Sequence, residues 1–188
     1  MDQSIDVVNN MERTALQTLL ARCCGATRWV SGMIDQRPFT DWPHLQQVAD
    51  DIWRTLAPAD WREAFAQHPK IGDLDSLRAK FASTESWSER EQAGVQDATE
   101  AVLQGLAQGN RDYERKFGYL FIVCATGKSA TEMLELLWQR LPNDPPDELP
   151  IAAEEQRRIM QIRLETWRRE LEADDPTPWP HHGETPNR

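Results

Sequence analysis

Residues 41–56 have the sequence DWPHLQQVADDIWRTL, and this stretch decides the fold class of the chain. Its apolar residues recur at intervals of three and four positions, the spacing that places side chains on one face of an α-helix. These residues are Leu45, Val48, Ala49, Ile52, Trp53 and Leu56. A proline in the first turn, Pro43, is also typical of a helix start. The stretch therefore predicts an amphipathic helix that begins near Asp41 or Trp42.

Other segments predict further helices from similar but weaker patterns. Upstream, the helical spacing recurs in Leu16, Leu19, Leu20 and Cys23, with Gly25 as the stop. A helix over 59–67 has to end by His68, because the residue before a proline is disfavoured in the α conformation. Downstream, we expect helices over 88–107, 113–125, 129–141 and 147–171, a break near 108–109, a turn at 126–129, and loops at 71–86 and 143–146.

The length and composition of the chain fit an all-α fold. The 188 residues include only nine glycines, and few segments alternate β-branched with polar residues as strands do. We expect one compact domain of about seven or more helices over residues 1–172. The segment 173–188 is rich in Pro, Asp and His, which predicts a disordered tail.

The charge balance and the apolar pattern exclude several classes of partner. Lys and Arg number 21 against 31 Asp and Glu, a net charge of −10, whereas nucleic-acid binding needs a basic surface. The longest apolar run, 119–125, is far shorter than the ~20 residues that cross a membrane. Three cysteines form no disulfide framework, and the polar N-terminus does not resemble a signal peptide. We expect a cytoplasmic protein that binds neither nucleic acid nor membranes.

Two short motifs have a simple structural interpretation. The sequence GKS at 127–129 resembles the end of a phosphate-binding loop, but position 122 is isoleucine where that motif requires glycine. Ser129 followed by Glu132 is instead typical of a capping box at a helix start. The pair His181-His182 lies in the proline-rich tail and is interpreted as solvated, and no other histidine or cysteine spacing indicates a metal site.

His68 is the first candidate for a catalytic residue. It stands at the end of a predicted helix, before Pro69, in the sequence HPKIG at 68–72. Proline fixes the backbone here, and a histidine held rigidly can give and take protons near neutral pH. The alternative is a histidine at a helix C-terminus that interacts only with the helix dipole.

Two further positions are suited to an anionic ligand. Ser88 and Glu91 form a second capping-box pattern, but a helix start also presents free backbone N–H groups to an anion. Arg163 falls in the middle of the apolar stripe of the last predicted helix, where an unpaired charge is costly. It has to pair with an internal carboxylate, extend to the edge of the stripe, or bind a ligand anion through its planar guanidinium.

Taken together, the motifs of this chain resemble those of one family. In order they are RPF at 37–39, HPKIG at 68–72, SxxEQxG at 88–94, NxxYxxKFGxxFI at 110–122, RLxN at 140–143 with Glu148, and IxxIRL at 159–164. This ordered set resembles the 2-oxo-4-hydroxy-4-carboxy-5-ureidoimidazoline (OHCU) decarboxylases, over about residues 9–171. One departure is Tyr119-Leu120, where many relatives have an aromatic residue followed by proline.

The resemblance implies an all-α homodimer that needs no cofactor or metal and converts OHCU to (S)-allantoin and CO2 during urate degradation. It implies catalytic roles for His68 and Glu91, with stereospecific protonation by the histidine. The implied substrate-binding residues are Pro69, Ser88, Glu89, Arg90, Glu91, Gln92, Phe121, Ile122, Val123, Cys124, Ala125 and Arg163, of which 121–125 act largely through their backbone. The alternatives are a helical binding module and a hydrolase of a related ureido compound.

Overall fold

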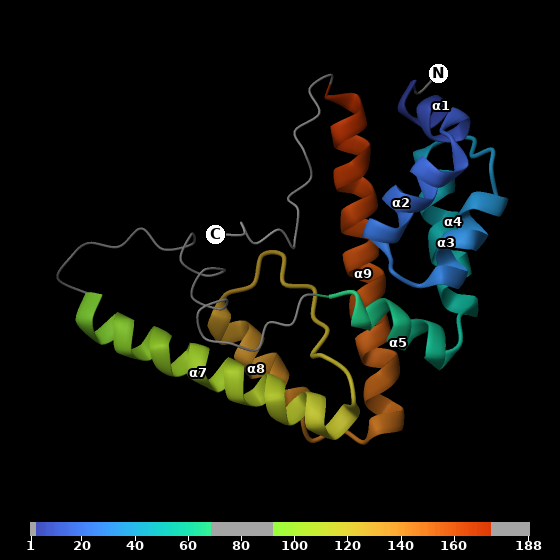
Figure 1. Cartoon of the computed structure of the whole chain (residues 1–188). Coiled ribbons are helices and arrows are strands. Elements are labelled where there is room, and N and C mark those ends of the chain that lie inside the picture. Colours follow the sequence, from blue (N-terminus) through green and yellow to red (C-terminus); the bar gives the residue numbers. More distant parts are fainter. Residues whose placement is uncertain (1–2, 69–91, 174–188) are drawn as a thin grey trace, which may run out of the picture. The chain divides into compact units, whose positions relative to one another are not determined.

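A computed structural model of the chain describes residues 3–68 and 92–173, and every regular element in these ranges is an α-helix (Figure 1). The prediction of an all-α fold is therefore confirmed. The helices are α1 (Gln3–Asn10), α2 (Arg13–Cys23), α3 (Thr27–Asp35), α4 (Trp42–Thr55), α5 (Pro58–Ala66), α7 (Gln92–Phe117), α8 (Ala130–Arg140) and α9 (Pro145–Glu172).

The chain divides into two compact units. Helices α1 to α5 and the part of α9 from Arg157 onward belong to the first unit. Helices α7 and α8 and the part of α9 up to Gln156 belong to the second. That residues 1–172 act as a single domain stays a prediction. Of the predicted tail at 173–188, all but Ala173 lies outside the described residues.

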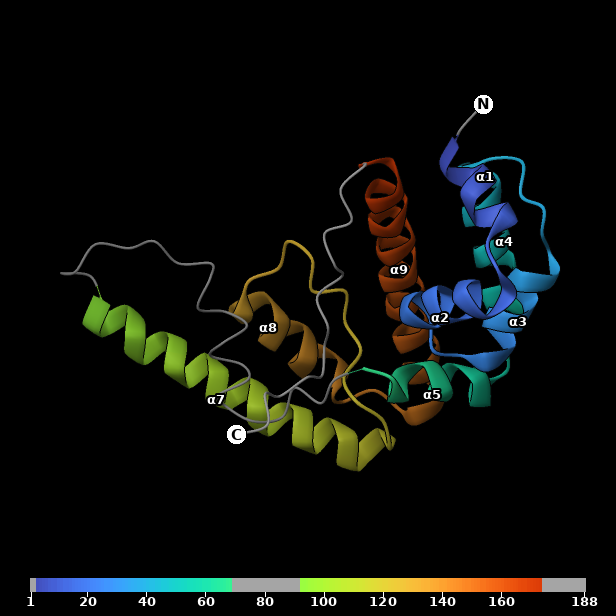
Figure 2. The ribbon, with the colours of Figure 1, turned by 45° about the horizontal axis from the view of Figure 1, so that its top comes forward.

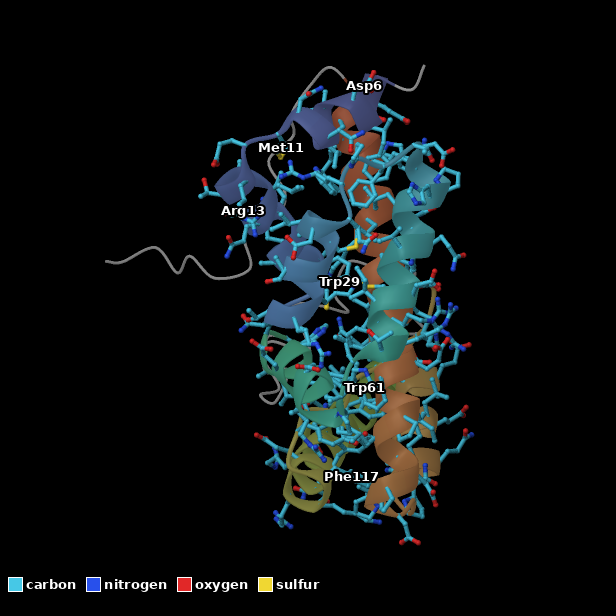
Figure 3. All side chains as sticks on the ribbon, turned by 90° about the vertical axis from the view of Figure 1, so that its right-hand side faces the viewer. Asp6, Met11, Arg13, Trp29, Trp61 and Phe117 are labelled. Carbon is cyan, nitrogen blue, oxygen red and sulfur yellow. The ribbon has the colours of Figure 1, made fainter. Side chains whose placement is uncertain are left out.

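Helix α4, in the first unit, forms where the sequence predicts an amphipathic helix. The Asp41 carboxylate accepts a hydrogen bond from the His44 N–H at 2.8 Å and so caps the start of the helix. Its buried face includes Leu45, Ala49 and Trp53. Trp29 of α3 is fully buried and donates its indole N–H to the Ala49 carbonyl at 3.0 Å (Figure 3). The apolar stripe thus packs against a helix that the sequence patterns did not predict.

Polar contacts also fasten α4 to the second half of α9. Arg157 forms an ion pair with Asp50 at 2.7 Å, and Gln161 donates to the same carboxylate at 2.7 Å. At one end of α4, the rings of Trp42 and Trp167 meet edge to face, with their centroids 5.6 Å apart. These contacts hold the segment of α9 that carries Arg163.

The RPF motif at 37–39 has a structural role in the first unit. The Asn9 side chain donates to the Phe39 carbonyl and accepts from the Phe39 N–H, both at 2.8 Å. Arg37 donates to the Met11 carbonyl at 2.8 Å. The motif therefore joins the connection between α3 and α4 to the end of α1 and to the connection that follows α1.

In the second unit, α7 runs without interruption through the predicted break at 108–109. The separate helices expected on either side of that break are wrong. A Cβ atom at Gly105 would lie 2.9 Å from Leu134, and one at Gly109 only 2.4 Å from Leu137. The glycines thus allow α8 to approach α7, and Figures 1 and 2 show these two helices side by side. The two glycines make room for a tertiary contact with α8, and the local sequence alone does not reveal such a contact.

The interpretation of residues 127–132 as a turn and a capping box is confirmed. Gly127 has a φ of +75°, the left-handed conformation that favours glycine. The Ser129 hydroxyl accepts from the Glu132 N–H at 3.2 Å, and the Glu132 carboxylate accepts from the Ser129 N–H at 2.7 Å. The Ser129 side chain of this GKS sequence therefore caps the start of α8.

Candidate functional site

His68 follows α5, which ends before it as predicted, and three-residue hydrogen bonds tighten the turn at this end of the helix. The Gln67 N–H donates to the Ala64 carbonyl at 3.3 Å, and the His68 N–H donates to the Phe65 carbonyl at 3.1 Å. These three-residue bonds hold the His68 backbone on the last turn, and its side chain is half-buried. This position fits both a proton carrier and a histidine beside a helix dipole.

The connection between α2 and α3 fixes this end of α5. A Cβ atom at Gly25 would lie 2.1 Å from the Gln67 side chain, so Gln67 packs directly on the Gly25 backbone. Nearby, Thr27 donates its N–H and its hydroxyl to the Glu63 carboxylate, at 3.1 and 2.6 Å. The residue next to His68 is therefore held against the loop that follows α2.

Arg163 of α9 contacts the last residues of α2, just before this loop. Its Nη1 donates to the carbonyls of Arg22 and Cys23, at 3.1 and 3.3 Å, which are acceptors at the C-terminal end of α2. Burial lowers the pKa of Arg163 from its ordinary value. Within residues 3–68 and 92–173, no carboxylate forms an ion pair with this guanidinium. The pairing with an internal acid that the sequence left open is thus not found there.

Arg163 thus binds the end of α2, and Gln67, the residue before His68, packs on Gly25 in the connection that follows α2. Several other predicted site residues lie outside the described residues: Pro69, Ser88, Glu89, Arg90 and Glu91. Gln92 is the first residue of α7. The roles of all these residues stay predictions.

The segment 121–125 is not helical, and the helix expected to run into it is wrong. Helix α7 ends at Phe117, and Gly118, which follows it, has a φ of +78° and donates its N–H to the Glu114 carbonyl at 2.8 Å. Beyond that point the chain follows an irregular path to α8 (Figure 1). Charged side chains bind its backbone: Arg140 donates to the Ile122 carbonyl at 2.8 Å, and Glu155 accepts from the Cys124 N–H at 2.7 Å.

A buried polar cluster supports this segment, and sequence patterns did not identify it. Glu148 is fully buried and accepts from Arg140 Nε at 2.8 Å, from Asn143 at 2.7 Å, and from the Tyr113 hydroxyl. Burial raises the pKa of Tyr113, so its hydroxyl stays a hydrogen-bond donor. The only signal in the sequence was the presence of Arg140, Asn143 and Glu148 among the family motifs.

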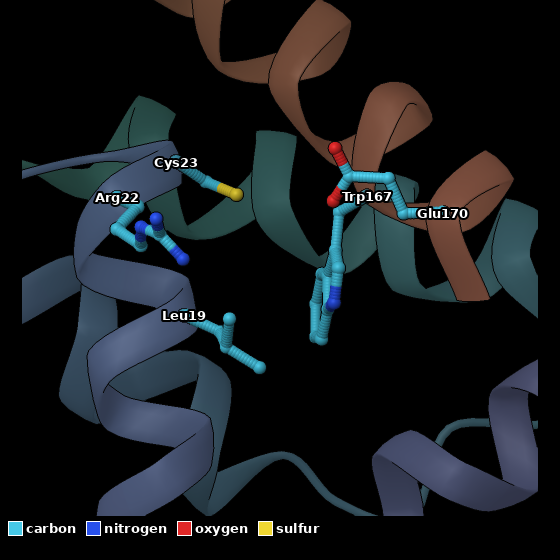
Figure 4. Close-up of a pocket in the computed structure, with 5 residues that line it drawn as sticks. All are labelled: Leu19, Arg22, Cys23, Trp167 and Glu170. Carbon is cyan, nitrogen blue, oxygen red and sulfur yellow. The ribbon is translucent and has the colours of Figure 1, made fainter. Parts of the chain in front are cut away.

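A small pocket, partly open to solvent, lies in the first unit between α2 and α9. Figure 4 shows Leu19 and Cys23 on α2 facing Trp167 on α9, with Arg22 and Glu170 at the sides. None of the predicted site residues lines it. Burial raises the pKa of the Cys23 thiol to about 12, so this sulfur is protonated near neutral pH and is not a nucleophile.

The adjacent thiols of Cys23 and Cys24 should make stability decrease at alkaline pH. Burial raises both pKa values to about 12 from the ordinary value of 9.0. An unfolded chain releases these protons first, so the stabilisation is complete below pH 9 and is lost as the pH rises toward 12. We expect up to about 1.4 kcal/mol per pH unit for each independent thiol, measured by urea unfolding between pH 8.5 and 10.5.

The control for this prediction is the double variant Cys23→Ala/Cys24→Ala. Lysines and tyrosines also titrate in this range, and they are unchanged in the double variant. The difference between the two pH profiles therefore isolates the thiols. Equal slopes in the wild type and the double variant would contradict the prediction.

Within residues 3–68 and 92–173, no group of three or more His, Cys, Asp or Glu side chains is placed to hold a metal ion. Nor does any helix there have the length and apolar character needed to span a membrane.

Comparison with known proteins gives consistent matches. A family model described as OHCU decarboxylase matches residues 9–165. The uric acid degradation bifunctional protein TTL of Arabidopsis thaliana is 39% identical over 145 residues, 76% of this chain and 44% of that protein. The 2-oxo-4-hydroxy-4-carboxy-5-ureidoimidazoline decarboxylase of Amia calva is 31% identical over 131 residues, 69% of this chain and 73% of that protein. The chain thus spans less than half of the plant protein.

Solved structures match the fold as well. The crystal structure of an OHCU decarboxylase in the presence of (S)-allantoin aligns with a TM-score of 0.65 and 33% identity, covering 85% of this chain and 99% of that one. The crystal structure of an (S)-allantoin synthase aligns with a TM-score of 0.62 at 14% identity, a likeness of fold alone.

Proposed function

The chain belongs to the OHCU decarboxylase family, and on that premise we propose that it converts OHCU to (S)-allantoin and CO2 during urate degradation. The observation that carries the proposal is Arg163, a half-buried cation bound to backbone carbonyls just before the loop on which Gln67, the residue before His68, packs. A guanidinium without an ion-paired carboxylate in the described residues is suited to a carboxylate ligand.

The proposed reaction begins with orientation of the substrate. Arg163 holds the anionic substrate, with further hydrogen bonds from the helix start near Ser88 and the backbone of 121–125. The carbon–carbon bond to the carboxylate breaks and releases CO2, while the electron pair stays on the ring carbon. Conjugation with the adjacent C=N or C=O group delocalises these electrons, so the reaction proceeds without a cofactor.

Protonation completes the proposed reaction. His68, assisted by Glu91, transfers a proton to one face of the ring carbon and so gives a single enantiomer. A histidine suits this step because its ordinary pKa lies near neutral pH.

The proposed function is tested by producing the unstable substrate from urate in situ and adding the protein. We expect faster CO2 release and a faster rise in the circular dichroism of (S)-allantoin than in the spontaneous decay. No acceleration would favour a helical binding module, and release of ammonia would favour a hydrolase of ureido compounds. Either result would overturn the proposal.

The arginine provides a second prediction. Replacing Arg163 by lysine should lower kcat/KM by about 10- to 150-fold, because a point charge does not replace the two-pronged guanidinium in a charge-assisted contact. The matched control is Arg158→Lys, the same change at an exposed position of α9, with less than a twofold effect. Equal activity of the two variants would show that Arg163 serves only the end of α2.

The assembly and the compartment are also part of the proposal. We infer a homodimer, the state implied by the family resemblance, and a cytoplasmic location, which the three buried free thiols support. Light scattering should give twice the chain mass of 21.7 kDa. A mass of one chain at micromolar concentration would contradict the dimer.

A further inference from the structure

We propose that Arg140, Glu155 and Lys128 are positioning residues that hold the backbone of segment 121–125 in the conformation that contacts substrate. The inference rests on the proposed function, because only there does this segment contribute backbone groups to the substrate. None of the three residues needs to touch the substrate itself.

The segment requires such support because it has no regular structure of its own. A helix satisfies its peptide groups internally, but 121–125 does not, while Ile122 is only 2% exposed and Cys124 only 7%. Buried peptide groups without partners are costly, so these groups need acceptors and donors from elsewhere. Charged side chains from α8, from α9 and from the turn before α8 supply them.

Arg140 has the most restrictive contacts of the three. Its side chain is 9% exposed, and it binds Glu148 through Nε and Nη2 while Nη1 donates to the Ile122 carbonyl. The same guanidinium lies 4.7 Å from the centre of the Phe121 ring, within the range of a cation–π contact. Because Glu148 fixes the guanidinium, the carbonyl of Ile122 and the ring of Phe121 are fixed with it.

Both backbone groups of Cys124, its N–H and its carbonyl, bind charged side chains. Its N–H donates to the Glu155 carboxylate at 2.7 Å, and its carbonyl accepts from Lys128 Nζ at 2.7 Å. One anion and one cation therefore bind the two backbone groups of a single apolar residue. The Lys128 N–H also donates to the Ala125 carbonyl at 3.1 Å and closes the turn that follows.

The packing of a five-residue segment against the core does not by itself require three charged side chains bound to its backbone. A chain that needed only to cover the core could leave such peptide groups to water or to a helix, without the cost of desolvating charges. Charged partners restrict the backbone to one conformation, which reduces the entropy lost when a ligand binds to it. A backbone binding surface benefits from this restriction, whereas a simple connection does not.

The test uses Glu155→Ala and the conservative Glu155→Gln, in which an amide oxygen still accepts from Cys124. The control is Glu135→Gln at an exposed position of α8. We expect Glu155→Ala to raise KM five- to twentyfold with kcat changed less than threefold, and to accelerate hydrogen exchange of 121–125 at least tenfold. Glu155→Gln should recover most of the KM and of the exchange protection. Arg140→Lys should raise KM similarly, because an ammonium cannot serve Glu148 and Ile122 together.

The outcomes separate this inference from the function on which it rests. An unchanged KM in a folded and active Glu155→Ala variant overturns the positioning role alone, as does a variant in which kcat falls and KM does not. A failure of Glu155→Gln to recover the KM also overturns it. A wild-type chain that does not accelerate the decarboxylation overturns the proposed function and this inference with it.

Discussion

Replacement of His68 by asparagine should lower kcat for decarboxylation by about 10²- to 10⁴-fold while the helical fold stays intact. General acid–base catalysis contributes about 10²- to 10⁴-fold, and asparagine cannot transfer a proton near neutral pH. The substitution leaves the backbone bond from the His68 N–H to the Phe65 carbonyl in place. The measurement is the rate of (S)-allantoin formation, with far-UV circular dichroism to verify the fold.

The matched control for this prediction is His44→Asn. His44 lies in the first turn of α4 and accepts a hydrogen bond from the Thr40 N–H at 3.1 Å, which an asparagine oxygen can also accept. Its activity should equal that of the wild type. Near-wild-type turnover of His68→Asn would refute the catalytic role of the histidine.

The same variant distinguishes the two interpretations of His68. A histidine that interacts only with the dipole of α5 contributes about 0.3–1 kcal/mol to stability and nothing to the chemical step. Its replacement would then lower the melting temperature slightly and leave kcat unchanged. A large loss of kcat at nearly constant stability is the result expected of a proton carrier.

The sequence predicted those parts of the fold that local signals determine. The start of α4 after Asp41, the end of α5 just before His68 and the capping box at Ser129 all depend on residues within one turn of each other. Proline and short polar side chains act on the backbone at this range, whatever the rest of the chain does. Such signals therefore predict helix ends well.

The errors occurred where distant residues determine the local structure. Gly109 suggested a helix stop, but its role is to admit Leu137 of α8, so α7 continues. The apolar run 121–125 suggested a continued helix, but side chains from α8 and α9 bind its peptide groups instead. No periodicity within either segment contains this information.

The sequence likewise predicted which residues belong to the candidate site but not all of their contacts. The position of Arg163 in an apolar stripe showed that its charge needed a partner, but not that the partners are the carbonyls of Arg22 and Cys23. Those acceptors belong to a helix about 140 residues earlier in the chain. Likewise, the sequence gives no indication that Arg140 and Glu148 are buried together, since eight residues separate them across the start of a new helix.

Replacement of Glu148 by leucine should lower the free energy of unfolding by about 3–5 kcal/mol. Removing one member of a buried ion pair leaves the other charge without compensation. Glu148 is fully buried, and its loss also removes the acceptor for Asn143 and for the Tyr113 hydroxyl. Urea unfolding followed by circular dichroism measures the effect. The control, Glu172→Ala, breaks the exposed pair with Arg168 and should cost less than about 1 kcal/mol.

A second substitution then separates the charge from the packing. In the double variant Arg140→Met/Glu148→Leu no unpaired charge remains, so stability should recover by at least about 2 kcal/mol relative to Glu148→Leu. Activity should not recover with it, because methionine cannot donate to the Ile122 carbonyl. The double variant would thus be folded but bind substrate poorly, with KM raised and kcat little changed. A recovery of both stability and KM would mean that the cluster serves only the core of the second unit.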